Sequence, residues 1–457
     1  MKKIKLTFYG GVQTVTGANF LLETDAGKKI LVDCGLTQGT DFADNSNHAP
    51  FSYDPTSVDY LIVTHSHIDH IGRIPKLVKD GFKGKILSTP ATFDLSAVMF
   101  DDAVKVIGDE ARHKGVLPLY EKTDVESTLS LWNSLPYHQV FDLEDGLSLR
   151  FKDSGHILGS AMAEISYGSK KIVLTGDLGN SPSLLLRDTE VIDNADYLVM
   201  ESVYGDRNHE TPEDRRLKLY NTLKEAIDKN MTILLPAFSL ERTQVVLYEL
   251  NGFIEKYGLP SVPVFLDSPL ALRVTDVYKK YTDDFNDFAK KEILGGDNIF
   301  NFPKLKLTKR LEESMGIEKL PGSKIIIAGS GMSNGGRILR HEKHYLPSPN
   351  TLVILVGYQA VGTLGRQIQD GVKELTIDGE TLTSRAKVIM INGYSSHKDS
   401  DHLLEFVAED SKVLKKAFVV MGEPKTSLFL VQKLKDELGV DAIHPGLNDS
   451  FDLDFGE

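Results

Sequence analysis

The sequence predicts an α/β protein of two domains, in which a parallel α/β domain is inserted into a domain that runs sheet, helix, sheet. Three observations lead to this prediction. The 457 residues are too many for one ordinary hydrophobic core. Residues 1–206 place short β-branched runs on either side of one long helical region, whereas in residues 207–394 short apolar runs alternate with long helical stretches. Residues 395–457 return to the earlier style.

Strands in the first part are expected where apolar, β-branched runs end at Gly, Asp or Asn. Before the helical region these runs are KIKLTFYG, NFLLETD, KKILVDCG and VDYLIVTH. The helical region spans roughly 92–134 and carries charges at helical spacing. The runs after it are LSLRFKDSGH, AMAEISYG, KKIVLTGD and DYLVMES. Polar clusters follow four of these strands, where catalytic side chains commonly lie on a rigid scaffold.

The inserted domain is expected to form a parallel sheet, because its apolar runs are separated by helices. The runs are MTILLPAF, VPVFLDSP, KIIIAGSG and TLVILVGYQ. The stretch KKEILGGDNIFNFPKL is expected to be a surface excursion. The last part returns to strand, helix and strand with KVIMINGYSSH, KAFVVMGEP and DAIHP.

Composition excludes several classes of protein. The chain is 41% hydrophobic, and none of its apolar runs is long enough to span a bilayer, so no membrane partner is expected. Cys34 is the only cysteine, which excludes an internal disulfide and fits a cytoplasmic location. The formal net charge of −13 argues against nonspecific coating of nucleic acid. It does not exclude a nuclease, because bound metals and a local basic cleft offset the overall sign.

Histidine and aspartate gather after four predicted strands. THSHIDH contains His65, His67, Asp69 and His70, and the other clusters are LVDCG, DSGHILGSA and LTGDLGN. Taken singly, each of these side chains is more often a turn or cap residue. Together they supply imidazole and carboxylate ligands, a set that suits zinc, with manganese as the alternative.

These motifs, in this order, resemble those of the metallo-β-lactamase fold hydrolases. The second half, with VMESVYGDR, PAFSLERTQ, SGMSNGGRILRH, VGYQAVGTLGRQI and NGYSSHKDSDH, resembles the β-CASP branch, whose members process nucleic acids. The resemblance covers nearly the whole chain and is closer to the RNA-processing members than to the DNA-repair members. It implies an αββα sandwich formed by residues 1–206 and 395–457, with a β-CASP domain inserted at 207–394. No additional RNA-binding module is recognisable, so a minimal bacterial or archaeal type of member is expected.

The resemblance also implies the metal ligands and their roles. His65, His67 and His156 would bind a first metal, Asp69 and His70 a second, and Asp177 would bridge the two. Asp33 would orient a ligand imidazole or the metal-activated water, and Asp69 could accept a hydrogen bond from that water.

Two further residues match family motifs that complete the catalytic machinery. In related nucleases the carboxylate at the place of Glu201 orients the histidine at the place of His397, which donates a proton to the leaving oxygen. The chemistry requires such a group, because an alkoxide is a poor leaving group unless it is protonated. The alternative readings are a turn residue after a strand for Glu201 and a helix-start residue for His397.

The chain departs from the family at one position. The RNA-processing relatives carry a histidine in an HGE-like turn, where this chain has Met421 in FVVMGEPK. A thioether is a soft ligand that does not suit zinc or manganese. We therefore expect two zinc sites, of which the second is the weaker.

Substrate contacts are expected in the glycine-rich GSGMSNGGR turn, whose small residues would let backbone N–H groups approach a phosphate. The candidates are Ser330, Gly331, Arg337, His341 and Arg366, with Arg242 as a further cation. For each arginine, the alternative is a salt-bridged surface residue.

The resulting hypothesis is a metal-dependent ribonuclease that hydrolyses phosphodiester bonds of an RNA substrate, with a homodimer left open. Three alternatives remain. Met421 favours a DNA nuclease of the same branch. A catalytically impaired RNA-binding subunit is disfavoured by the retained ligands, Glu201 and His397. An ester or thioester hydrolase is disfavoured because it needs no inserted nucleic-acid clamp.

Overall fold

The computed structural model describes residues 2–38, 46–360 and 362–456, and within them the chain divides into two compact units. The first unit comprises residues 1–183, 187–208 and 397–457, and the second comprises residues 184–186 and 209–396. The predicted domains have boundaries at 206 and 394, so these units differ by two residues at each junction and by the segment Leu184–Leu186.

Two mixed sheets form the centre of the first unit. In the described part of the chain each has seven strands. The order in one sheet is β22 (Ser450–Asp454), β1 (Lys3–Gly10), β2 (Asn19–Thr24), β3 (Lys29–Val32), β4 (Tyr60–Ile62), β5 (Lys85–Ser88), β6 (Trp132–Ser134). The order in the other is β21 (Ala442–Ile443), β20 (Lys416–Val419), β11 (Tyr197–Met200), β10 (Lys170–Leu174), β9 (Ala161–Tyr167), β8 (Leu147–Asp153), β7 (Val140–Glu144).

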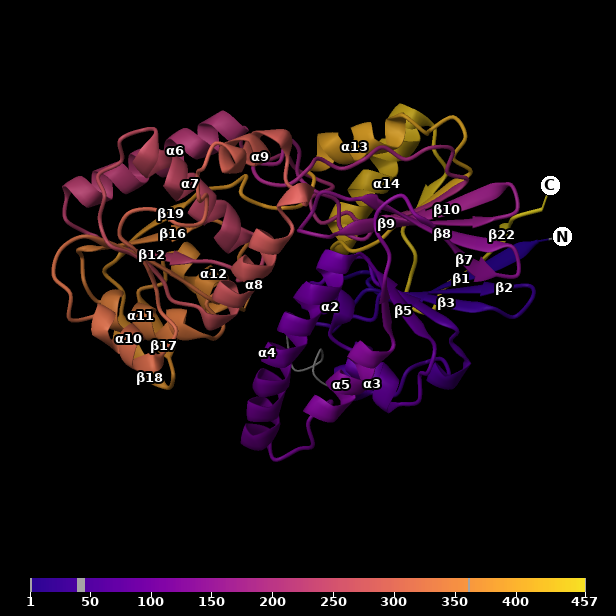
Figure 1. Cartoon of the computed structure of the whole chain (residues 1–457), viewed down its shortest axis with the longest axis horizontal. Coiled ribbons are helices and arrows are strands. Elements are labelled where there is room, and N and C mark those ends of the chain that lie inside the picture. Colours follow the sequence, from indigo (N-terminus) through magenta and orange to yellow (C-terminus); the bar gives the residue numbers. More distant parts are fainter. Residues whose placement is uncertain (1, 39–45, 361, 457) are drawn as a thin grey trace. The chain divides into compact units, whose positions relative to one another are not determined.

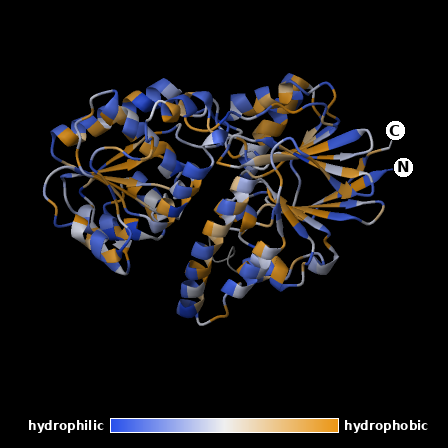
Figure 2. Ribbon diagram, in the orientation of Figure 1, coloured by the Kyte–Doolittle hydropathy of each residue, from blue (hydrophilic) through white to orange (hydrophobic). Residues whose placement is uncertain are grey.

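Alternating side chains hold these two sheets face to face. Ile4, Leu6 and Phe8 of β1 lie in the same buried cluster as Leu149 and Phe151 of β8, because every second residue of a strand points to one face. Figure 2 shows the strands as predominantly apolar and the helices as mixed. The first and last strands, β1 and β22, pair antiparallel, so the start of β1 and the end of β22 lie next to each other (Figure 1).

Helices cover the outer faces of both sheets. The helices of this unit are α2 (Ile68–Ile71), α3 (Ile74–Lys79), α4 (Pro90–Lys114), α5 (Lys122–Ser130), α13 (Ser400–Ala408) and α14 (Pro424–Leu438), with a 3-10 turn at Pro55–Ser57. Leu77 of α3, Phe100 of α4 and Val125 of α5 pack against the sheet that contains β1. Leu403 of α13 and Leu430 of α14 pack against the other sheet. The predicted αββα sandwich is therefore confirmed.

The second unit contains a parallel sheet of six strands in its described residues. Their order is β14 (Leu305–Leu307), β13 (Val264–Leu266), β15 (Lys324–Ala328), β12 (Thr232–Pro236), β16 (Thr351–Leu355), β19 (Lys387–Met390). A hairpin of β17 (Glu374–Ile377) and β18 (Glu380–Thr383) lies outside this sheet. The predicted parallel α/β architecture is confirmed.

The helices of the second unit alternate with its strands. They are α6 (Pro212–Asp228), α7 (Arg242–Glu255), α8 (Pro269–Lys280), α9 (Asp287–Leu294), α10 (Leu311–Ile317), α11 (Arg337–Tyr345) and α12 (Leu364–Gln369), with a 3-10 turn at Thr282–Asp284. Ile317 of α10, Tyr345 of α11 and Ile368 of α12 pack on one face of the sheet. Among the described residues, no helix combines the length and the apolar character needed to cross a membrane.

One local prediction was wrong. The helical region predicted at 92–134 is two helices, because Gly115 ends α4 in a left-handed conformation, and the region closes with the short strand β6. The predicted surface excursion in residues 290–305 is exposed or half-buried along most of its length, but Ile299, Phe300 and Phe302 within it are buried. Apolar residues scattered at irregular spacing gave no period from which their burial could be read.

Candidate metal centre and active site

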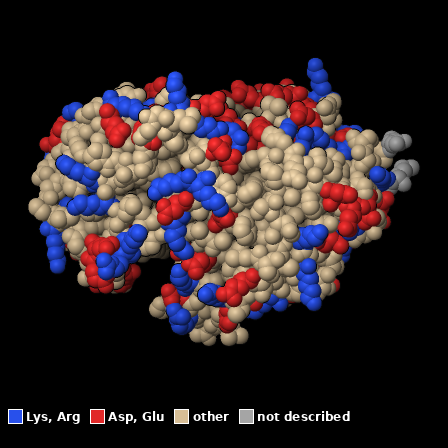
Figure 3. All heavy atoms as spheres, viewed as in Figure 1, with Lys and Arg blue, Asp and Glu red and all other residues tan. Residues whose placement is uncertain are grey.

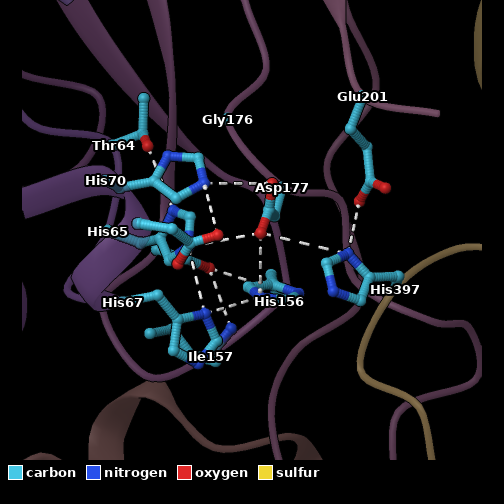
Figure 4. A network of polar contacts seen from close by, with 12 residues as sticks. Thr64, His65, His67, His70, His156, Ile157, Gly176, Asp177, Glu201 and His397 are labelled. Atoms are coloured by element: carbon cyan, nitrogen blue, oxygen red, sulfur yellow. Dashed lines mark hydrogen bonds and ion pairs between the residues drawn. The ribbon is translucent and has the colours of Figure 1, made fainter. Parts of the chain in front are cut away.

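The candidate site residues of the first unit all lie at one edge of the two sheets. Apart from His397, which precedes α13, each follows the carboxyl end of a strand, and these strands are β3, β4, β8, β10, β11 and β20. Strands β3 and β4 are parallel, as are β10, β11 and β20. Strand β9 is antiparallel to both β8 and β10, so β8 runs in the same direction as β10. The strand directions therefore bring distant parts of the sequence together at this edge (Figure 4).

Four ligand atoms converge here from three strand ends. His67 Nδ1 lies 3.2 Å from His65 Nε2 and 3.2 Å from His156 Nε2. Asp177 Oδ2 lies 3.4 Å from each of the same Nε2 atoms. Zn–N bonds of about 2.0–2.1 Å in a tetrahedron require ligand atoms about 3.3 Å apart. These four separations therefore suit ligand atoms that share one zinc ion.

Asp33 holds two of the ligand imidazoles in place. Its Oδ2 lies 2.7 Å from His70 Nδ1 and accepts a hydrogen bond of 2.8 Å from the Thr64 hydroxyl. That hydroxyl is 3.1 Å from His65 Nδ1, and the Thr64 backbone N–H donates to Asp33 Oδ1. Asp33 is fully buried, so it acts on the site through these partners. The sequence analysis did not single out Thr64, although it directly precedes His65 in THSHIDH.

The glycine of LVDCG allows this packing. A Cβ atom on Gly35 would lie 1.5 Å from the carbonyl oxygen of Asp69. Glycine is therefore required for the segment after β3 to pass directly against helix α2. The contact fixes Asp69 and His70 relative to Asp33.

A second, looser group adjoins the first. His70 Nε2 lies 3.4 Å from Asp177 Oδ1 and 4.0 Å from Asp69 Oδ2. His70 Nε2 and Asp177 Oδ1 are both buried, and neither has a hydrogen-bond partner among the described residues. Buried polar atoms left without a partner call for an explanation, and an ion between them is one. His70, Asp69 and Asp177 therefore fit a cation, but with wider spacing than the first group.

Met421 lines a small cavity together with Asp33, Thr64 and His70. It is 2% exposed, and its Sδ atom would lie 2.7 Å from a Cβ added at Gly11. Its φ of 48° is in the left-handed region, which histidine adopts more readily than most residues. The backbone conformation at this position would therefore also suit a histidine.

Glu201 and His397 form a pair beside Asp177. Glu201 Oε1 lies 3.0 Å from His397 Nδ1 and accepts a hydrogen bond of 2.7 Å from the Leu178 backbone N–H. Its other oxygen accepts from the Val203 backbone N–H. His397 Nδ1 is 3.9 Å from Asp177 Oδ2. Because backbone N–H groups fix both of its oxygens, this carboxylate is placed to orient His397.

The electrostatics favour neutral imidazoles at His67 and His156. Burial holds the pKa of His67 and of His156 well below the ordinary value, which leaves their ring nitrogens unprotonated for a metal. Burial also lowers the pKa of His397, but the carboxylates of Glu201, Asp177 and Asp69 outweigh it and raise that pKa to about 9.

The predicted substrate contacts lie in the second unit. Two of them, Arg337 and His341, contact Asp267 instead. His341 is fully buried, and its Nε2 lies 2.7 Å from Asp267 Oδ2. Arg337 donates from Nη1 to Asp267 Oδ1 at 2.6 Å and to the Thr308 carbonyl. These side chains anchor α11 to the end of β13, so His341 is not placed to contact a substrate. The sequence analysis missed Asp267, the acceptor they share.

Of the remaining candidates, Ser330 and Arg366 are half-buried, whereas Gly331 and Arg242 are buried. Ser330 and Gly331 lie in the loop between β15 and α11, where the Ser330 hydroxyl accepts from the Asn334 backbone N–H. Arg366 is half-buried on α12 and pairs with Asp370. Arg242 is buried and donates to the Val356 carbonyl.

Glu342 supports the same loop and gives a prediction about pH. It accepts a hydrogen bond from Ser333, and burial raises its pKa to about 8. Between about pH 4.5 and 8 the folded chain therefore holds a proton on Glu342 that the unfolded chain has lost. The free energy of unfolding falls as pH rises through this range. We expect Glu342→Gln to remove that loss. In urea unfolding, the free energy of unfolding of the variant relative to the wild type should increase by a few kcal/mol from pH 5 to pH 8. An equal difference at both pH values would contradict it.

Known families match the chain along most of its length. The metallo-beta-lactamase superfamily matches residues 14–207, the Beta-Casp domain matches residues 243–368, and the Zn-dependent metallo-hydrolase RNA specificity domain matches residues 382–445. A crystal structure of an Enterococcus faecalis protein of unknown function has a TM-score of 0.57 at 13% identity, with 99% of this chain and 100% of that chain covered, which supports the fold.

Three relatives align with most of the chain, and two of them are of similar length. Ribonuclease TTHA0252 of Thermus thermophilus is 35% identical over 93% of this chain and 95% of that protein. The RNase J-like protein of Methanocaldococcus jannaschii is 31% identical over 97% and 98%. The transcription termination factor FttA of Methanosarcina mazei is 32% identical over 96% of this chain and 70% of that protein. The chain thus belongs to the β-CASP family of the metallo-β-lactamase superfamily, as its motifs predicted.

Proposed function

We propose that this protein is a metal-dependent ribonuclease. The observation that carries the proposal is the set of four ligand atoms that lie within 4.8 Å of one another, with the Glu201–His397 pair beside Asp177. The match to a domain described as an RNA specificity domain, and relatives named as ribonucleases, support RNA as the substrate. Acidic and basic side chains are interspersed over the face in Figure 3, so RNA recognition is expected to depend on local groups.

His65, His67, His156 and Asp177 would hold zinc at the first site. Asp69 and His70 would hold a second ion with the other oxygen of Asp177, with manganese as an alternative metal. Such ions lower the pKa of water and stabilise the charge of the attacking and leaving oxygens.

The side chains of this site divide the remaining work. Asp33 fixes the orientation of His70 and, through Thr64, of His65. Asp69 is placed to accept a hydrogen bond from the attacking water. His397, held through Nδ1 by Glu201, would deliver a proton from Nε2 to the leaving oxygen.

Met421 gives a prediction about the second site. The backbone at this position suits histidine, and the side chain borders the cavity that contains His70. Met421→His should therefore add a ligand and raise the metal retained after dialysis against a mild chelator towards two ions per chain, whereas the wild type retains distinctly fewer. Met421→Leu, of similar size and without a donor atom, is the control. Two metals in the wild type, or no gain in the histidine variant, would contradict this role.

Cleavage of 5′-labelled single-stranded RNA and of DNA of the same sequence, with zinc or manganese supplied, tests the function. We expect RNA to be cut in strong preference. Preferential cutting of DNA would establish the DNA nuclease alternative instead. RNA binding without cleavage under either metal would indicate a catalytically impaired subunit.

A further inference from the structure

The sheet of the second unit has a topological switch point between β12 and β16. These strands are adjacent and parallel. The chain leaving β12 continues to β13, towards one edge of the sheet, whereas the chain leaving β16 continues to β19, towards the opposite edge. In open parallel sheets, ligands bind beyond the carboxyl ends of the strands at such a point.

An exposed aromatic residue lies at this switch point. Phe238 follows β12 by two residues and is 37% exposed. A Cβ on Gly331 would lie 2.7 Å from Phe238 Cδ2, and a Cβ on Gly357 would lie 3.8 Å from its Cε2. The ring therefore packs on the glycine backbones of the two neighbouring loops, and the rest of it faces solvent.

The surroundings of the ring are rigid. The Phe238 carbonyl accepts hydrogen bonds from the backbone N–H and the hydroxyl of Thr243. Gln359 donates from Nε2 to the carbonyls of both Gly331 and Gly357, at 3.0 Å each, and so ties the two loops together. Tyr358, next to Gly357, is 38% exposed. A single exposed apolar residue is ordinary on a protein surface, but one held in a fixed orientation at a switch point is a preformed platform.

We propose that Phe238 stacks against a nucleobase of single-stranded RNA, an inference that rests on the proposed function and adds a recognition site to it. Unpaired bases stack on aromatic side chains regardless of sequence, since every base has a flat π face. Gly331, a predicted substrate contact, would contribute indirectly, because its lack of a side chain leaves room for the Phe238 ring. Tyr358, which follows Gly357 in the neighbouring loop, is a second exposed aromatic residue of this region.

The test compares three variants by steady-state cleavage of single-stranded RNA with the metal-loaded enzyme. Phe238→Leu keeps an apolar contact with the glycines but removes the aromatic face, whereas Phe238→Tyr and Phe238→Trp keep it. We expect the leucine variant to raise KM by about 10-fold, within the roughly 5- to 150-fold span of one lost stack, with kcat within about twofold. The two aromatic variants should match the wild type. Polyphosphate, an anion without bases, should inhibit all four proteins equally.

Fluorescence provides a readout that does not depend on cleavage. Trp132 is the only tryptophan of the chain, so Trp132→Phe combined with Phe238→Trp places a single reporter at the platform. RNA should quench it and polyphosphate should not. If the wild type cleaves RNA while Phe238→Leu keeps its KM, or if RNA leaves the reporter unquenched, the stacking role is overturned and the ribonuclease stands. If all three variants lose kcat alike, the ring is structural and the proposal also fails. A wild type that neither binds nor cleaves RNA overturns both.

Discussion

His65→Ala should remove most of the bound zinc and lower RNA cleavage by more than about 100-fold. His65 Nε2 is one of four ligand atoms, 3.2 Å from His67 Nδ1 and 3.4 Å from Asp177 Oδ2. Its loss leaves three donors, and the fully buried position gives a replacement ligand little access. Changing residues that merely orient metal ligands costs about 10- to 100-fold, so losing a ligand should cost more.

Metal analysis of the purified variant, beside the cleavage assay, checks this result. His113→Ala is a matched control, because His113 is exposed in the last turn of α4. It should keep both the metal and the activity. Full metal content in His65→Ala would contradict the assignment of the first site, and a variant that lost metal but kept its activity would separate that metal from catalysis.

The sequence predicted the site well because its chemistry is local to strand ends. Each cluster combines an apolar run with a polar residue directly after it, as in VDYLIVTH and KKIVLTGD. Parallel strands then bring such ends to one edge of a sheet, so the convergence of His65, His156 and Asp177 follows from the topology. Family resemblance, rather than periodicity, predicted the αββα sandwich.

Residues that act through others were harder to predict. Asp267 looked like an ordinary residue after a strand, and its partners Arg337 and His341 were expected to contact substrate. Both residues lie 70 or more positions from Asp267 in the sequence. A local sequence pattern does not predict which distant buried carboxylate a cationic side chain will contact. Phe238 was likewise hidden, because exposure at a switch point depends on the strand order of the whole sheet.

The alanine variants of Glu201 and His397 should show strongly non-additive losses of activity. His397 Nδ1 and Glu201 Oε1 are 3.0 Å apart, so the carboxylate acts on the reaction through the imidazole it orients. General acid catalysis contributes about 10²–10⁴-fold, and each single variant should lose an amount of that order. The double variant should then be about as slow as His397→Ala alone. Once the imidazole is absent, removing the carboxylate that orients it causes no further loss of rate.

Two further measurements separate proton donation from structural damage. Glu201 also accepts from the backbone N–H of Leu178, next to Asp177, so the metal content of every variant must be measured. His402→Ala is the control, since His402 pairs with Asp399 at 2.7 Å on α13 as His397 pairs with Glu201, but is more exposed. A nitrophenyl phosphodiester, whose leaving group departs without protonation, should be hydrolysed by His397→Ala nearly as fast as by the wild type. If the losses multiply, or if the variant is equally slow on both substrates with its metal intact, His397 does not protonate the leaving oxygen.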